Sequence, residues 1–161
     1  MALANKTQEE TNKENREHCK RIARDVEAYA EGRIYKCPEC GEEFELYDMY
    51  GENFHINEEG NEIGKCPGCG YTSEGYNEFE QLSLYDYFSD CLDIEYRVSG
   101  KGRDDYRSVR IMVAFGGPNI YIDTASKAVE LYWWTDQASY PLTHDVCDEI
   151  DDWASEMWAC L

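Results

Sequence analysis

Two closely spaced cysteine pairs constrain the fold of this chain more than any other feature of its sequence. The chain reads Cys-Pro-Glu-Cys-Gly from Cys37 and Cys-Pro-Gly-Cys-Gly from Cys66. A Cys-x-x-Cys turn places two thiols on one side of a tight knuckle, and the glycine after it supplies the positive φ that the turn requires. Two knuckles together complete a site with four sulfur ligands, which suits Zn²⁺ at Zn–S distances of ~2.3 Å. We therefore predict one structural Zn²⁺ per chain, bound by Cys37, Cys40, Cys66 and Cys69.

Residues 35–71 resemble the zinc-ribbon family, because both knuckles match its pattern. The resemblance implies two knuckles carried on antiparallel hairpins around a structural zinc ion. The segment between the knuckles differs from that of a minimal ribbon, since residues 41–65 form a long insert with eight acidic residues and one basic residue. Ribbons that bind nucleic acid usually present basic and aromatic residues at this place.

Other uses of the four cysteines stay open at the level of the sequence. A redox-active dithiol pair or a pair of disulfides would use the same residues, and a site of four cysteines also accepts iron, as in rubredoxin-like proteins. A catalytic zinc ion is not expected, because four thiolates leave no coordination position for water. The other cysteines fall on or beside apolar stripes, so we expect them to be core thiols in a reducing cytosol. They are Cys19, Cys91, Cys147 and Cys160.

The charge of the chain argues against several classes of partner. Its 34 Asp and Glu residues and 15 Lys and Arg residues give a formal net charge of −19 over 161 residues. Such a chain lacks the basic clusters that grip nucleic-acid phosphates, and an anionic membrane surface would repel it. No apolar run approaches the ~20 residues of a membrane span, and residues 1–20 contain no hydrophobic signal core. We expect a cytoplasmic protein, in the host cytosol if a phage encodes it.

Charge also divides the chain into segments. Residues 1–33 hold seven acidic and seven basic residues, whereas residues 34–161 carry the entire net charge. We predict an N-terminal helix over 1–33, a zinc ribbon with its acidic insert over 34–81, and a further domain over 82–161. The predicted fold class of the whole chain is α+β.

The N-terminal segment has the start and stop signals of a helix. Thr7 and Glu10 fit a capping box, and Gly32 fits the position just past a helix C-terminus. From Cys19 onward, apolar residues at spacings of three and four give one narrow stripe. We expect the half before Cys19 to be a solvated helix start, in preference to a recognition or dimerisation arm. The members of the stripe are Cys19, Ile22, Val26 and Tyr29.

The C-terminal domain shows alternating strands between two helices. A short helix is expected from Leu82 to Cys91, and segments with apolar residues at every second position follow. The links are too short for parallel crossovers, so we expect an antiparallel meander of four strands. The apolar positions are Ile94, Tyr96 and Val98; Val109, Ile111 and Val113; Ile120 and Ile122; and Val129, Leu131 and Trp133.

A C-terminal helix should pack against one face of this four-stranded sheet. Thr143 suits the N-cap position, and an apolar stripe follows at Val146, Ile150, Trp153, Met157 and Cys160. At about 100° per residue, four carboxylates point away from the stripe and give the helix an acidic outer face. These are Asp145, Asp148, Asp151 and Asp152.

Aromatic residues gather near the end of the fourth strand. Alternation places Trp133 inward with Leu131, and it places Tyr132 and Trp134 on the opposite face. That second face is either covered by the first helix or exposed to a partner, and we expect coverage. It would also hold Tyr121, Met112 and Tyr106.

No catalytic constellation is recognisable in the sequence. None of His18, His55 and His144 stands in a metalloprotease or nucleophile motif. His144 precedes Cys147 by three residues, but in the first turn of a helix capping is the usual role. The carboxylates show no spacing that nominates an acid–base pair. We expect a protein that is not an enzyme.

These features favour a binding protein whose partner is a basic, nucleic-acid-binding protein. An acidic surface can occupy a nucleic-acid groove by imitating phosphate charge. In composition the chain resembles the small acidic inhibitors that phages and mobile elements direct against restriction or CRISPR nucleases. We predict an inhibitor of this anti-CRISPR or antirestriction type, a DNA mimic that binds no nucleic acid itself. The candidate partner-binding residues are Asp145, Asp148, Asp151 and Asp152, then Glu58, Glu59 and Glu62, then Tyr132 and Trp134.

A second hypothesis belongs to a different class of protein. The chain would be a zinc-ribbon adaptor subunit that assembles with a transcription, replication or translation complex of its own host. The sequence indicates no oligomeric state under either hypothesis.

Overall fold

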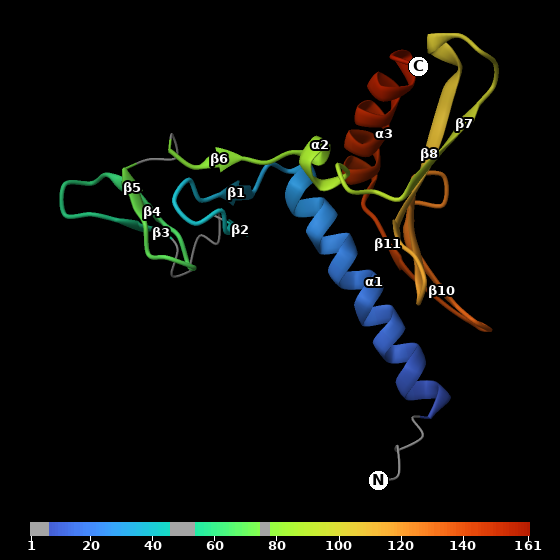
Figure 1. Cartoon of the computed structure of the whole chain (residues 1–161), viewed down its shortest axis with the longest axis horizontal. Coiled ribbons are helices and arrows are strands. Elements are labelled where there is room, and N and C mark those ends of the chain that lie inside the picture. The colour runs from blue at the N-terminus through green and yellow to red at the C-terminus, as the bar shows by residue number, and fades with distance from the viewer. Residues whose placement is uncertain (1–6, 46–53, 75–77) are drawn as a thin grey trace. The chain divides into compact units, whose positions relative to one another are not determined.

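The computed structural model describes residues 7–45, 54–74 and 78–161. The chain forms two compact units, shown in Figure 1. The sheet unit combines the described part of Met1–Glu27 with Tyr87–Leu161, and the ribbon unit is Ala28–Asp86. No helix of the described chain is long and apolar enough to cross a membrane.

The sheet unit contains five antiparallel strands in the order β11-β10-β9-β8-β7 (Figure 1). Each strand pairs with its neighbours in the chain, so the sheet is a meander, as predicted. A short 3₁₀ helix, η1 (Arg103–Asp105), precedes the second of these strands. The strands are β7 (Asp93–Val98), β8 (Tyr106–Ala114), β9 (Asn119–Asp123), β10 (Ala128–Trp133) and β11 (Asp136–Pro141).

The fifth strand corrects the predicted number of four. β11 has the sequence Asp-Gln-Ala-Ser-Tyr-Pro, which lacks an alternation of large apolar residues, and none of its side chains is buried. A two-residue turn, Trp134-Thr135, sets its register, because Trp133 pairs with Asp136. An edge strand that buries little leaves no hydrophobic period to recognise, so this strand escaped the sequence analysis.

One face of the sheet carries the core of the unit. Its central side chains are fully buried at Val109, Ile111, Ile120, Ile122, Val129 and Leu131. The helix α3 (His144–Ala159) buries Val146, Ile150 and Trp153, and the Trp153 ring lies 4.7 Å from that of Phe88. Buried residues of α1 (Gln8–Ala30) add Cys19, Ala23 and Val26.

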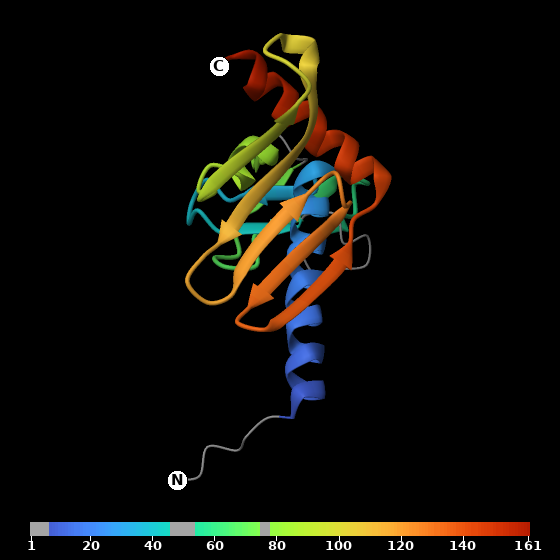
Figure 2. The ribbon, with the colours of Figure 1, turned by 90° about the vertical axis from the view of Figure 1, so that its right-hand side faces the viewer.

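Both helices lie behind the same face of the sheet, as Figure 2 shows. Ala23 of α1 lines one hollow together with Leu142 and Val146, which places α1 beside the start of α3. Our expectation that the first helix covers the second face was therefore wrong. Two apolar stripes pack on the apolar face, whereas the second face carries Arg110 and Glu130, which offer no apolar surface to a helix.

The ends of α1 follow the predicted signals. The backbone N–H of Thr7 donates to Glu10 Oε2 at 2.9 Å, and the N–H of Glu10 donates to Thr7 Oγ1 at 3.3 Å, which is a capping box. Gly32 has a φ of +66°, and its N–H donates to the carbonyl of Tyr29. No residue from 7 to 18 is buried, in agreement with a solvated helix start.

The helix α2 is shorter than predicted, and the buried residues at the end of α3 differ from the predicted ones. The helix predicted from Leu82 to Cys91 is the single turn α2 (Leu84–Tyr87). Thr143 caps α3 as predicted, since its Oγ1 accepts from the N–H of Val146 at 3.3 Å. Near the C-terminus Met157 and Cys160 are exposed, and Trp158 takes the inward place. Its ring lies 5.6 Å from that of Tyr96, and its Nε1 donates to the carbonyl of Gly102.

The ribbon unit consists of two small antiparallel sheets. β1 (Ile34–Lys36) pairs with β2 (Glu43–Glu45) and β6 (Glu80–Gln81). β4 (Glu62–Lys65) pairs with β3 (Phe54–Ile56) and β5 (Thr72–Glu74). One buried cluster of this unit consists of Tyr35, Cys37, Phe44, Cys66 and Phe79, so two of its five members are cysteines of the predicted metal site.

Candidate metal centre and surface sites

The two knuckles are built in the same way on two hairpins. In the β1–β2 hairpin the N–H of Gly41 donates to the carbonyl of Cys37 at 2.9 Å, and in the β4–β5 hairpin the N–H of Gly70 donates to that of Cys66 at 2.9 Å. The two glycines have φ values of +75° and +77°. A Cβ atom at either position would meet no atom within 4 Å, so glycine is favoured for its backbone conformation and not for space.

The four predicted cysteines come together with the spacing of a metal site. Their Sγ atoms all lie within 4.8 Å of one another. The Sγ atoms of Cys37 and Cys69 are 3.7 Å apart, and those of Cys40 and Cys66 are 3.6 Å apart. Tetrahedral Zn²⁺ with Zn–S bonds of ~2.3 Å would hold its sulfurs about 3.8 Å apart, whereas a disulfide needs about 2.05 Å. The four residues therefore fit a metal ion and not a pair of disulfides.

The pKa values of the thiols differ within one knuckle. Burial opposes ionisation of Cys37, but the backbone N–H groups of Cys40 and Glu39 and the neighbouring thiols donate to its sulfur and lower its pKa to about 7. At Cys40 the N–H of Glu42 acts to lower the pKa, yet desolvation and the adjacent thiols raise it to about 12. Several thiolates at this spacing need a cation between them, which a metal ion supplies.

Burial distinguishes the two cysteines of each knuckle. The first cysteine of each pair, Cys37 or Cys66, is buried in the aromatic cluster, and the second, Cys40 or Cys69, is exposed. The ring of Phe79 contacts those of Phe44 at 5.3 Å and Tyr71 at 5.7 Å and closes the buried side. Four sulfur ligands would saturate a tetrahedral ion, so the centre suits a structural metal and offers no position to a substrate.

The predicted carboxylates of the insert lie on the β3–β4 hairpin. Glu58 and Glu59 are exposed in its turn, and Glu62 is exposed at the start of β4. The side-chain Oδ1 of Asn57 accepts from the N–H groups of Glu59 at 3.0 Å and Asn61 at 2.9 Å, which orders the turn. Residues 46–53 of the insert lie outside the described residues.

Three of the four predicted carboxylates of α3 face solvent. Asp151 does not, because it accepts hydrogen bonds from the hydroxyls of Thr124 and Tyr106, the first at 2.7 Å. The angular count placed Asp151 outward, and it placed Tyr106 on the second face; the hydrogen bond between them shows both on the helix-covered side. The exposed carboxylates are Asp145, Asp148 and Asp152.

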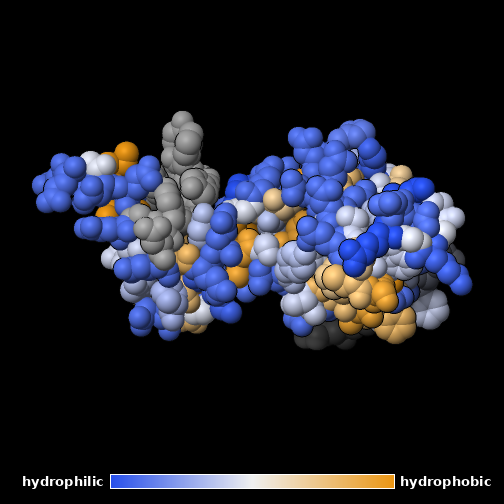
Figure 3. All heavy atoms as spheres, turned by 90° about the horizontal axis from the view of Figure 1, so that it is seen from above, coloured by the Kyte–Doolittle hydropathy of each residue, from blue (hydrophilic) through white to orange (hydrophobic). Residues whose placement is uncertain are grey.

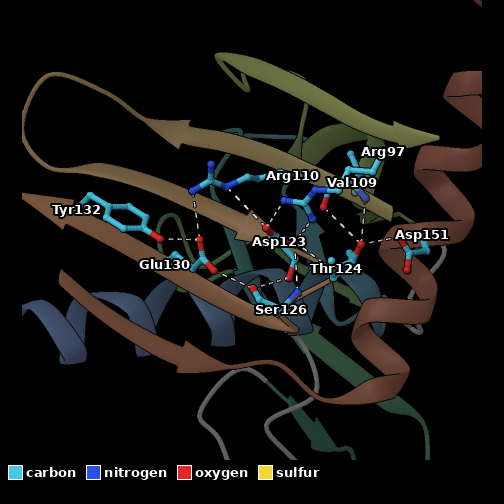
Figure 4. Close-up of polar contacts among 10 residues, drawn as sticks. Arg97, Val109, Arg110, Asp123, Thr124, Ser126, Glu130, Tyr132 and Asp151 are labelled. Carbon is cyan, nitrogen blue, oxygen red and sulfur yellow. Dashed lines mark hydrogen bonds and ion pairs between the residues drawn. The ribbon is translucent and has the colours of Figure 1, made fainter. Parts of the chain in front are cut away.

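The open face of the sheet carries a charge network that the sequence analysis missed (Figure 4). Arg97 donates twice to Asp123, at 2.7 Å each, and Arg110 lies 3.7 Å from the same carboxylate. Arg110 also pairs with Glu130 at 3.2 Å, and the hydroxyl of Tyr132 donates to Glu130 at 3.0 Å. Arg110 and Asp123 are direct partners in the β8–β9 register, a signal that needs the strand pairing to be visible.

Two arginines of the sheet, Arg97 and Arg110, are held in ion pairs by this network. Burial opposes ionisation of Asp123, but Arg97 and the backbone N–H groups of Ser126 and Ala125 hold the pKa of its carboxyl below the usual range. Arg107 donates to the backbone carbonyls of Asp104 and Tyr106 and to Ser99 Oγ. Arg97 and Arg110 therefore have their charge compensated by carboxylates, whereas Arg107 donates only to uncharged oxygens.

A Cys–His dyad is not formed at the start of α3. His144 Nδ1 lies 2.5 Å from the ammonium of Lys127. Cys147 is buried, and desolvation raises the pKa of its thiol to about 11. A reactive cysteine needs the opposite shift.

The predicted aromatic residues are exposed at one end of the sheet. Tyr132 is 40% exposed and Trp134 is 92% exposed. Trp133, which we expected to point into the core, is 37% exposed and lies over Gly117, where a Cβ would come within 2.2 Å of its ring. The Trp133 ring therefore lies against the backbone of the turn between β8 and β9. Any residue larger than glycine at position 117 would collide with the ring.

Comparisons with models of protein families, with curated proteins and with solved structures found no match to this chain. The likeness to zinc ribbons therefore rests on the four cysteines and on their geometry. The likeness to phage-encoded inhibitors of host nucleases rests on composition and receives no support from these comparisons.

Proposed function

We propose that this protein is a zinc-stabilised, non-enzymatic acidic protein that binds and inhibits a basic, nucleic-acid-binding protein of a host defence system. The observation that carries the proposal is the distribution of charge. Carboxylates lie exposed on both units, whereas the arginines of the open sheet face are held in ion pairs. A surface of this kind attracts a basic groove and repels phosphate.

The ribbon unit supplies the denser of two acidic surfaces. Ala28–Asp86 contains 14 acidic and three basic residues. One of the three basic residues, Arg33, already pairs with Glu31 and Glu45. The exposed carboxylates among the described residues of this unit are Glu31, Glu39, Glu42, Glu43, Glu58, Glu59, Glu62, Glu74, Glu78, Glu80 and Asp86.

The helix α3 supplies a second, more regular surface. Asp145, Asp148 and Asp152 stand at spacings of three and four, so successive carboxylates are separated by about 5 Å along the helix axis. This is of the same order as the rise of ~3.4 Å per phosphate along one DNA strand. In the described chain none of the three forms an ion pair. They therefore keep their full charge for a partner.

In this proposal the zinc ion stabilises the ribbon unit and takes no part in binding the partner. Cys37, Cys40, Cys66 and Cys69 would hold it, and it would fix the β1–β2 and β4–β5 hairpins, the second of which shares β4 with the hairpin of the acidic turn. None of the eight cysteines forms a disulfide, which suits action in a reducing cytosol.

Capture of the partner from a host lysate tests the proposal. The tagged protein should retain a nucleic-acid-binding protein at low salt and lose it as salt is raised, because the contact is electrostatic. Nucleic acid should compete with this protein for the same site. The double variant Asp148→Lys/Asp152→Lys and the double variant Glu58→Lys/Glu59→Lys identify the surface used, and we expect roughly 10- to 100-fold weaker binding for one of them.

A matched control uses Glu9→Lys/Glu17→Lys, which changes the net charge equally at two exposed positions of α1. This variant should bind the partner within about twofold of the wild type if position matters and not charge alone. Mimicry is excluded if nucleic acid does not compete and neither double reversal weakens binding. Capture that persists at high salt would instead favour the adaptor hypothesis.

Direct binding to DNA gives a second test. We expect a Kd no tighter than ~10⁻⁴ M for duplex DNA at physiological salt, the weak end of the non-specific range. A reproducible gel shift at micromolar protein in such salt would contradict the proposal.

A further inference from the structure

The turn between β10 and β11 combines two unfavourable features in one residue. Trp134 occupies the first position of the two-residue turn and has a φ of +53°. Its side chain is 92% exposed, the highest value among the large hydrophobic residues described. Two-residue hairpin turns favour Asn or Gly at such a position, because a bulky side chain is strained at positive φ.

No buried contact of the Trp134 side chain offsets the conformational cost of its positive φ. The left-handed conformation is unfavourable for a residue with a Cβ atom, and an exposed indole recovers almost nothing through burial. Strained residues that the core does not require are concentrated at binding sites. The same turn built with Asn-Gly would be more stable, so Trp134 serves something other than the fold.

Neighbouring aromatic rings extend the surface around Trp134. The rings of Trp133 and Trp134 are 6.5 Å apart at an angle of 85°, and Trp133 is fixed in place over Gly117. Together with Tyr132 they line a shallow hollow whose remaining wall is Gly116, Gly117 and Asn119. We call Tyr132, Trp133 and Trp134 the aromatic end of the sheet. Figure 3 shows that the face of the molecule turned to the viewer, which is not the face of the aromatic end, is mostly hydrophilic.

Charge decides the kind of partner that suits the aromatic end. Asp136 lies directly across the ladder from Trp133, and its Oδ1 accepts a hydrogen bond from Gln8 Nε2 at 2.7 Å. Among the described residues this carboxylate forms no ion pair, whereas Glu130 is paired with Arg110. An anionic ligand such as a nucleic acid or a lipid surface is repelled here, whereas a cation is attracted to the face of an indole ring.

The open face already shows the contact that such a cation would make. The guanidinium carbon of Arg110 lies 3.9 Å from the ring centre of Tyr121 and 5.8 Å from that of Tyr132. Arginine suits stacking on aromatic rings better than lysine, because its guanidinium is planar and weakly hydrated.

We propose that the aromatic end is a docking surface for an arginine-bearing segment of the partner protein, with Trp134 as its anchor. This inference rests on the proposed function only in that the partner is basic. Exposed tryptophan and tyrosine residues are the side chains that most often dominate binding energy at interfaces.

A labelled oligoarginine peptide tests the proposal by fluorescence anisotropy with the full chain at physiological salt. Trp134→Asn should weaken binding at least ~10-fold, since an indole that contributes one cation–π contact and its apolar area is lost. Trp134→Phe keeps an aromatic face and should retain most of the affinity. Leu161→Asn, which alters another side chain that is 86% exposed, is the matched control and should bind as the wild type does.

Thermal unfolding separates docking from a structural role. Asn tolerates a positive φ, so Trp134→Asn should leave the unfolding midpoint of the sheet unit unchanged or raise it. A lowered midpoint would show that Trp134 belongs to the fold and would overturn the proposal. So would a wild-type chain that binds no oligoarginine, or one that is dimeric and becomes monomeric in Trp134→Asn.

The outcomes also separate this inference from the proposed function. If Trp134→Asn binds the peptide and the captured partner normally while the carboxylate reversals lose both, docking at the aromatic end is wrong and acidic binding stands. If Trp134→Asn alone loses them, the aromatic end is the docking surface and mimicry by carboxylates fails.

Discussion

The two units of this protein are held together by different means. The sheet unit has strands of five to nine residues, with fully buried Ile, Val and Leu side chains along one face. The ribbon unit has strands of two to four residues, and the cluster beside its four cysteines has five buried members. Such short strands bury little apolar area, so we expect a metal ion at the four cysteines to supply part of the stability of this unit.

Charge makes the difference between the units larger. The ribbon unit carries 14 acidic and three basic residues in 59 residues, Ala28–Asp86, and their mutual repulsion opposes a compact state. The sheet unit places its buried charges in pairs, such as Arg97 with Asp123. The comparison teaches that the acidic surface of the ribbon unit depends on the cysteines, whereas that of α3 depends on an apolar core.

The largest expected effect comes from breaking the metal centre. Cys37→Ser should unfold the ribbon unit and leave the sheet unit folded, because structural zinc contributes on the order of 10 kcal/mol that is folding energy. Hydrogen exchange should lose protection in β1, β4 and β5 and keep it in β8 to β10. Cys160→Ser, which removes an exposed cysteine outside the cluster, is the control. Absence of stoichiometric metal in freshly purified wild-type protein would contradict the prediction.

The reverse change breaks the core of the sheet unit. Ile122 is fully buried at the centre of the sheet, so Ile122→Ala should cost about 2–5 kcal/mol of unfolding free energy. Metal content and exchange protection in the ribbon unit should not change. Val98→Ala, at a position that is 38% exposed, should cost far less. Equal losses in both units after Ile122→Ala would mean that the two units unfold as one.

Substitutions at Gly116 and Gly117 test whether Trp133 is held in place at the aromatic end. Gly116 and Gly117 both have positive φ, but a Cβ at Gly117 would collide with the ring of Trp133 and one at Gly116 would meet nothing within 4 Å. Gly117→Ala should therefore cost about 1–3 kcal/mol more than Gly116→Ala, measured by chemical denaturation. Equal costs would show that Trp133 moves freely and is not held by Gly117.

The smallest effect concerns the acid side of the pH profile. The pKa of Asp123 is lowered in the folded state, so the unfolded chain takes up its proton first as the pH falls. Its contribution to stability is present above about pH 4, the usual pKa region of Asp, and is lost as the pH falls through the folded pKa. Denaturation between pH 7 and pH 3 should show a weaker dependence in Asp123→Asn. An unchanged profile would mean that other carboxylates dominate.

The local features of this protein could be read from its sequence. The capping box of Thr7 and Glu10, the cap of Thr143 and four of the five strands depend on residues close together in the chain, and the structure confirms them. The cysteine cluster was also predictable, because each Cys-x-x-Cys turn is a local unit and two such turns can complete one site with four sulfur ligands.

Tertiary packing decided the rest, because these features depend on pairings between distant segments. β11 is a strand through its register with β10 and not through its own apolar pattern. Asp151 points inward because it accepts hydrogen bonds from the hydroxyls of Thr124 and Tyr106. The angular spacing of residues along one helix cannot predict these partners, since they lie on the sheet. Both helices pack on the same face of the sheet, which leaves Tyr132 and Trp134 exposed to solvent. Hydrophobic periodicity says which side of an element is apolar, but which apolar sides meet is settled by the shape of the whole unit.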